Sequence, residues 1–279
     1  MEIKQRGSAL GHNIILFMYK ILGYDVVAFS LNFVALYYVL FTPSVKRSLK
    51  SYYEHQGIKL TNKVYFRHIK MFALSVFDRF ASKIKADSCS TELVDERAIE
   101  ALQDGGVMLS SHVGSWAAAS NILLNKLPQM NVVMRENTKQ DIKKVEVNTS
   151  QYQEEIIKII DLSKGAIAAN IQIANALMNK ELVALMADRV VDKRQVVEVE
   201  LFGSKVKINK NPFDIATRLK KPIVAMFIMN VSKKRYTLGL HLIEEKTIEE
   251  MAQAYANLLE ANMKKYPSQW YNFYDFFKS

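Results

Sequence analysis

His112 is the residue of this sequence whose surroundings best suit chemistry. It directly follows an apolar run, Gly106 to Ser111, that is typical of a buried strand. Gly114 and a stretch of alanines come next, which predicts a helix start that Ser115 can cap. An imidazole placed there can take a proton from an attacking hydroxyl, and the nearby backbone N–H groups can bind a phosphate or an oxyanion. The pattern therefore suggests a general base, although a histidine at a strand end commonly has only a structural role.

Asp188 occupies a second position of the same kind. It comes just after another apolar run, Leu182 to Met186, which also predicts a buried strand. In sheets whose strands are joined through helices, active residues gather where strands end and loops begin. His112 and Asp188 are therefore both expected at such an edge.

Several familiar kinds of site are missing from the sequence. The other histidines lack partners at metal-ligand spacing, and the lone Cys89 allows neither an intrachain disulfide nor a cysteine cluster. There is no glycine-rich phosphate loop, and "HVGSWA" is not the G-x-S-x-G turn of an α/β-hydrolase. We therefore expect no metal and no redox cofactor, and a single thiol fits a reducing compartment.

The elements that must position these residues alternate between strand and helix from residue 105 onward. Strands joined through helices predict an α/β domain with a mixed, largely parallel sheet flanked by helices. Asn211 and Pro212 should open one of the helices, with the asparagine as its cap. Beside the two runs already named, we predict strands over 131–135, 196–202, 223–229 and 236–243, and helices over 151–161, 166–179 and 247–264.

An amphipathic helix is also predicted before this region. Apolar residues from Phe66 to Phe80 recur at spacings of three and four, which gives one apolar face. Asp78 and Arg79 on this helix are consistent with an ordinary pair of solvated charges.

The N-terminal part of the chain is unusually apolar. Val26–Phe41 is a run of sixteen residues without a charge, whereas a full transmembrane helix needs about 20 apolar residues. The basic residues Lys46, Arg47 and Lys50 follow, and if the run spans or dips into a membrane, such a flank puts the next domain in the cytoplasm. We interpret residues 1–50 as a membrane-associating segment and 51–279 as the α/β domain; the alternative is a buried helix of a soluble domain.

The charge of the chain is compatible with several partners. A net charge of +10 suits nucleic acid, anionic lipid or an acidic carrier protein. The lysines are scattered and no recognition motif for nucleic acid is present, so we expect no nucleic-acid partner. The balance of 49% hydrophobic and 24% charged residues is that of an ordinary folded protein.

The segment "GGVMLSSHVGSWAAASNIL" resembles the first motif of the lipid A late acyltransferases, within the lysophospholipid acyltransferase superfamily. That motif is commonly written H-x-G-N-W-E. His112, Gly114 and Trp116 match it, and Ser115 stands in the place of the asparagine.

Further resemblance runs over most of the chain. Asp188 falls on the family's aspartate, with Arg189 where glutamine is common, and Leu201–Gly203 is similar to its F-F-G turn. Asn211 stands where glycine is usual, and the tail "YPSQWYNFYDFF" is similar to the family's P-x-Q-W ending. The N-terminal apolar segment and the helix "FALSVFDRF" also resemble the family, especially its subgroup near aryl-polyene and related glycolipid gene clusters. The resemblance implies a glycerolipid acyltransferase-like α/β fold.

One departure concerns the acid of the first motif. Its position is taken by Ala117, whereas in the family a carboxylate is thought to orient the histidine. Three hypotheses follow: another carboxylate substitutes, with Asp188 preferred and Glu136 second; His112 works without one; or the chain binds lipid or an acyl carrier without turnover.

The resemblance implies acyl transfer from an acyl thioester to a hydroxyl or amine of a membrane lipid or glycolipid. The donor is carried by acyl carrier protein or coenzyme A, and His112 is the base. Substrate contacts are expected from Ser115, Trp116 and Glu136. Arg135 and Arg189 suit a phosphate, although surface ion pairs explain them equally well. A basic surface suits an anionic bilayer and an acidic carrier, so we expect the protein at the cytoplasmic face of the bacterial inner membrane.

Overall fold

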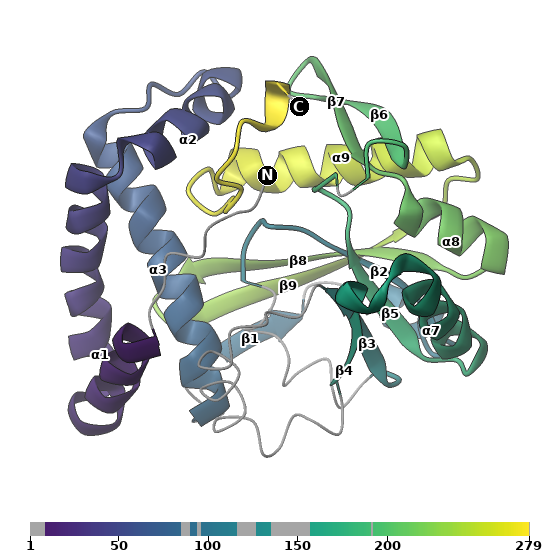
Figure 1. The fold of residues 1–279 in the computed structure, drawn as a ribbon, viewed down its shortest axis with the longest axis horizontal. Coiled ribbons are helices and arrows are strands. Elements are labelled where there is room, and N and C mark those ends of the chain that lie inside the picture. Colours follow the sequence, from purple (N-terminus) through teal and green to yellow (C-terminus); the bar gives the residue numbers. More distant parts are fainter. Residues whose placement is uncertain are drawn as a thin grey trace.

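The computed structural model describes residues 9–84, 90–93, 96–115, 127–134, 157–190 and 192–278. Its centre is a seven-stranded sheet flanked by helices (Figure 1). The strands are β1 (Ser90–Leu93), β2 (Gly106–Ser110), β3 (Met130–Met134), β4 (Ile157–Asp161), β5 (Leu182–Met186), β8 (Ile223–Ser232) and β9 (Arg235–Ile243).

The sheet has the order β1-β9-β8-β2-β5-β3-β4, so β2, which leads to His112, lies near its middle. The pair β8–β9 is antiparallel and the other five neighbouring pairs are parallel. A separate antiparallel hairpin consists of β6 (Val196–Leu201) and β7 (Ser204–Asn209). The predicted α/β class with a mixed, largely parallel sheet is confirmed.

Described helices contribute to the cores on both faces of the sheet, and their boundaries follow local signals. The last long helix, for example, begins with a capping box between Thr247 and Glu250. The helices are α1 (Ala9–Phe41), α2 (Pro43–His55), α3 (Asn62–Ile84), α4 (Arg97–Ala101), α7 (Ala166–Met178), α8 (Asn211–Leu219) and α9 (Ile248–Lys265), with short 3₁₀ turns η3 (Leu162–Lys164) and η4 (Phe276–Lys278).

The central strand β2 is buried on both faces, as its apolar sequence predicts. Val107 and Leu109 point into the larger core, which also contains residues of α7, α8 and α9. Met108 between them points into a second core, on the side of α4. Because successive side chains of a strand alternate between faces, a wholly apolar strand is required to fill both cores.

Two sequence predictions about these elements are wrong. The predicted helix over 151–161 is contradicted at Ile157–Asp161, which form the edge strand β4, while 151–156 lie outside the described residues. Its β-branched isoleucines favour the strand and pair with β3. Asn211 is the first residue of α8 rather than its cap, and the backbone N–H of Asn211 donates instead to the Asn209 side chain, at 3.1 Å. Strands β1 and β7 were not predicted.

The N-terminal helix α1 packs lengthwise against α3 and bends at Gly23, whose φ is 79° (Figure 1). Its inner face is buried against Phe77 and Ala81 of α3. One stretch among the described residues, Phe17–Phe41, is long and apolar enough to cross a membrane, and only 22% of its most apolar window is buried. A core helix would be enclosed, whereas α1 exposes an outer face of large apolar side chains: Phe17, Ile21, Phe29, Phe33, Leu36, Tyr37, Leu40 and Phe41.

Asp78 is not the solvated charge that its sequence context suggested. It is fully buried where α1, α3 and β9 meet, and it accepts hydrogen bonds from the hydroxyls of Tyr24, at 2.8 Å, and Tyr236. Burial raises the pKa of Asp78 to about 6, against a partial lowering by the two tyrosines and Lys234. The side chain of Arg79 lies outside the described residues.

This shifted pKa predicts a pH-dependent stability. Between about pH 4 and pH 6 the folded protein holds a proton on Asp78 that the unfolded chain releases, so stability falls as pH rises through this window. We expect a loss of roughly 2 to 3 kcal/mol in the free energy of unfolding, complete above pH 6, and its absence in Asp78→Asn. Denaturant unfolding of both proteins across this range measures it.

The control is Asp104→Asn, because Asp104 is exposed and its pKa is lowered by Lys180. That variant should keep the wild-type slope. A constant difference in stability between wild type and Asp78→Asn from pH 4 to pH 7 would contradict the assignment.

Candidate active site

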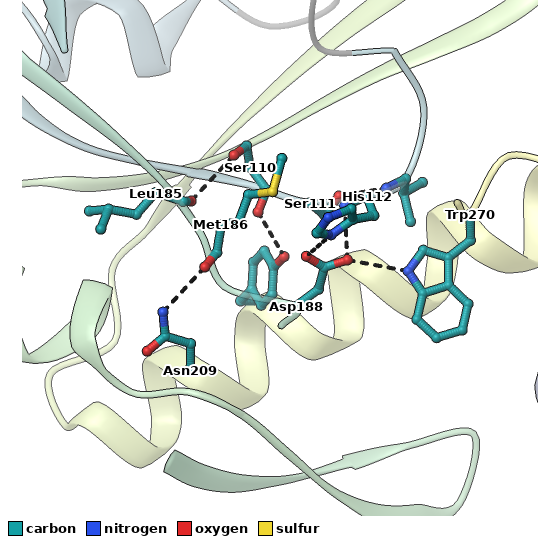
Figure 2. Close-up of polar contacts among 10 residues, drawn as sticks. Ser110, Ser111, His112, Leu185, Met186, Asp188, Asn209 and Trp270 are labelled. Carbon is teal, nitrogen blue, oxygen red and sulfur yellow. Dashed lines mark hydrogen bonds and ion pairs between the residues drawn. The ribbon is translucent and has the colours of Figure 1, made fainter. Parts of the chain in front are cut away.

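His112 and Asp188 meet at the carboxyl ends of two neighbouring parallel strands. Ser110, the last residue of β2, lies opposite Met186, the last of β5, so the residues two positions further along fall side by side. The ring Nδ1 of His112 lies 2.9 Å from Oδ1 of Asp188, and the backbone N–H of His112 donates to Oδ2 at 2.8 Å (Figure 2). The parallel pairing of β2 with β5 therefore assembles the predicted pair.

A third donor reaches the carboxylate from the C-terminal tail. The indole N–H of Trp270 donates to Oδ2 of Asp188 at 3.2 Å (Figure 2). Burial by itself raises the pKa of the fully enclosed Asp188, but the charge of His112 and the hydrogen bonds from His112 and Trp270 together hold this pKa below its usual range. Asp188 is therefore ionised at neutral pH.

The ionised carboxylate determines which nitrogen of His112 can react. A carboxylate can only accept hydrogen bonds, so Nδ1 must carry a proton, and in the neutral imidazole Nε2 is then left with a lone pair. The side chain of His112 is 20% exposed, and its Nε2 makes no hydrogen bond with the described residues. This is the arrangement of a histidine base oriented by an acid.

The loop that carries His112 is held by backbone hydrogen bonds on both sides. The N–H of Gly114 donates to the carbonyl of Gln269 at 2.7 Å, and that of Ser115 to the carbonyl of Ile228 at 2.8 Å. Gly114 has a φ of 75°, and a Cβ there would overlap the carbonyl oxygen of Ile228. The glycine of the motif thus lets the loop pass directly against β8.

Trp270, Gln269 and Tyr255 support the site, and the sequence reasoning gave them no role. The Gln269 side chain bonds both the N–H and the carbonyl of Asn230, at 3.0 and 2.8 Å, which ties the tail to β8. Tyr255 is buried, which raises its pKa well above the usual range, and its neutral hydroxyl donates to the carbonyl of Ser110 at 3.2 Å. The "PSQW" tail was the signal that could have found the first two.

Of the other predicted site residues, the structure describes Arg189 and Ser115. Arg189 is half-buried, with its guanidinium carbon 5.3 Å from the centre of the Tyr274 ring. Ser115 is buried beside β8, and the prediction that it caps a helix concerns residues outside those described. Outside them too are Trp116, Ala117, Arg135 and Glu136.

Comparison with known proteins identifies the family to which the chain belongs. No curated protein matches the sequence. A family model described as bacterial lipid A biosynthesis acyltransferase matches residues 63–279, which is more than half of the chain and includes every residue of the site described above. The chain therefore belongs to the bacterial lipid A biosynthesis acyltransferase family, whose membership supports a lipid acyltransferase activity.

Proposed function

We propose that the chain transfers an acyl group from an acyl thioester to a hydroxyl or amine of a membrane lipid or glycolipid. The donor is carried by acyl carrier protein or coenzyme A. The observation that supports this most directly is the contact of 2.9 Å between His112 and a buried, ionised Asp188 within a chain of this family.

The geometry supports general base catalysis by His112. Nε2 takes the proton of the acceptor as its oxygen or nitrogen attacks the thioester carbonyl, and Asp188 stabilises the imidazolium that forms. Collapse of the tetrahedral intermediate breaks the C–S bond, and the imidazolium returns the proton to the leaving thiolate. The products are the acylated lipid and a free thiol.

Asp188 is the carboxylate that we propose in place of the acid missing at Ala117. It makes the Nδ1 contact that an orienting acid must make, and three hydrogen bonds hold it there. The alternatives are a base that works without an acid and a lipid- or carrier-binding protein without turnover. The intact His112–Asp188 pair favours the enzyme.

Arg189 is our candidate to bind a phosphate of the donor. It follows Asp188 directly, its guanidinium lies over the ring of Tyr274, and arginine suits paired hydrogen bonds with an anion. The exposed apolar face of α1 supports work at a membrane, with residues 1–50 as the associating segment. We place the domain at the cytoplasmic side because basic residues follow the apolar run.

Transfer of a radiolabelled acyl group to bacterial membrane lipids tests the proposal. We expect label in a lipid with wild type, and a loss of roughly 10³-fold or more with His112→Ala, because the base is removed. His55→Ala is the control, since His55 contacts the carbonyl of Ser51 and the ring of Phe277 and makes no hydrogen bond with Asp188. Absence of transfer by wild type from either donor, over a broad set of acceptors, would favour the binding protein instead.

A further inference from the structure

A basic pocket lies beside the end of the apolar helix, away from the His112 site. It has a volume of about 650 Å³, within the range of small-molecule sites. Four basic side chains line it against a single acidic one, Glu54. Its lining residues are Pro43, Lys46, Arg47, Lys50, Glu54, Gly57, Ile58, Lys59 and Leu60.

The pocket follows from the two faces of α2. Lys50 follows Lys46 by four residues and Arg47 by three, and Glu54 follows Lys50 by four, so these side chains share one side of the helix. The opposite side buries Leu49, Tyr52 and Tyr53 in the core. Residues 57–60, which follow the turn at Gly57, form the second wall.

The positive charge of this pocket is poorly neutralised. Arg47 and Lys59 are exposed, and their side chains make neither a hydrogen bond nor an ion pair with the described residues. Lys50 contacts Glu54 at 3.6 Å, but both side chains are largely exposed, and such a pair is worth little. Lys46 donates to the uncharged side chain of Asn62 at 2.6 Å, which supplies no counter-charge. The pocket is therefore suited to an anion.

The surface next to the pocket indicates where that anion comes from. Tyr37, Leu40 and Phe41 at the end of α1 are exposed, and α2 begins at Pro43. Lys46 lies only five residues beyond Phe41, in the first turn of α2. In a bilayer the acyl chains lie directly below the phosphate groups. The apolar side chains at the end of α1 and the basic cluster beside them follow the same order.

We propose that this pocket binds the phosphate headgroup of an anionic membrane lipid while the outer face of α1 rests in the acyl-chain region. Because α1 is fixed lengthwise against α3, the headgroup site and the apolar face can engage the same leaflet. The proposal goes beyond the acyl-transfer reaction and shares with it only the membrane setting.

The test is binding to vesicles of phosphatidylcholine with and without phosphatidylglycerol. The variant Arg47→Gln/Lys50→Gln/Lys59→Gln leaves Lys46 and its contact with Asn62 in place. It should bind the anionic vesicles roughly 100-fold more weakly, since each basic residue near a charged surface contributes about a five-fold factor. Binding to pure phosphatidylcholine should be unchanged.

The matched control removes the same charge elsewhere, with Lys207→Gln/Lys220→Gln/Lys246→Gln. Equal losses in the two triple variants would overturn the pocket in favour of a general charge effect. If millimolar inorganic phosphate released wild type from the anionic vesicles as well as competing phosphatidylglycerol does, the pocket would be a site for free phosphate. If the pocket variant lost only the binding of acyl carrier protein, the pocket would be a protein site. His112→Ala should bind vesicles as wild type does, which separates this test from that of catalysis.

Discussion

Asp188→Asn is expected to lower acyl transfer by roughly 10³- to 10⁴-fold, the size of effect seen when the orienting carboxylate of a Ser-His-Asp triad is replaced. An amide at this position is neutral and can donate to Nδ1, which favours the histidine tautomer with its proton on Nε2. Such a histidine cannot act as a base. The substitution also removes the negative charge of Asp188 that stabilises the imidazolium of His112. The rate constant for transfer from a labelled donor measures the effect.

Asp192→Asn provides the matched control. Asp192 lies four residues further on and forms an exposed ion pair with Arg194 at 2.9 Å, so its loss should change the rate by less than about two-fold. Turnover by Asp188→Asn at the wild-type rate would show that His112 works without this carboxylate. Thermal unfolding of each variant establishes that the comparison is made between folded proteins.

Gly114→Ala should destabilise the fold by about 3 to 5 kcal/mol and abolish activity, because two penalties act together. The backbone at Gly114 has a φ of 75°, which L-residues adopt only with strain. The added Cβ would also overlap the carbonyl oxygen of Ile228, which cannot retreat because it accepts the N–H of Ser115. The free energy of unfolding in denaturant is the measurement.

Gly203→Ala separates the two penalties. Gly203 has a φ of 71°, but nothing lies within 4 Å of the position that its Cβ would take. Its substitution should therefore cost only about 1 to 2 kcal/mol from the backbone. If both variants lost the same stability, the close approach of the His112 loop to β8 would not be the cause.

Local patterns in the sequence were sufficient to predict most elements of the fold. The apolar runs that became β2 and β5 are long enough and apolar enough to require burial on both faces. The final helix is marked by Thr247 and Glu250 at capping-box spacing. Each of these signals is contained within a few neighbouring residues, which is why it can be interpreted without the rest of the chain.

The errors arose where neighbouring residues allow two answers. Ile157–Asp161 is short, and its register against β3 is what makes it a strand rather than part of a helix. Asp78 looked solvated because it stands beside Arg79 in the sequence. It is buried because Tyr24 and Tyr236, 54 and 158 residues away, bring their hydroxyls to it.

The sequence by itself determined that His112 and Asp188 follow strands of an α/β domain of this family, because strand, loop and motif are local. It could not determine that they touch. Contact depends on β2 and β5 being parallel neighbours in one register, and on Trp270 returning from the far end of the chain to hold the carboxylate. Pairing partners in a sheet are chosen by the packing of the whole core, so only the tertiary structure could show that Asp188 reaches Nδ1 of His112.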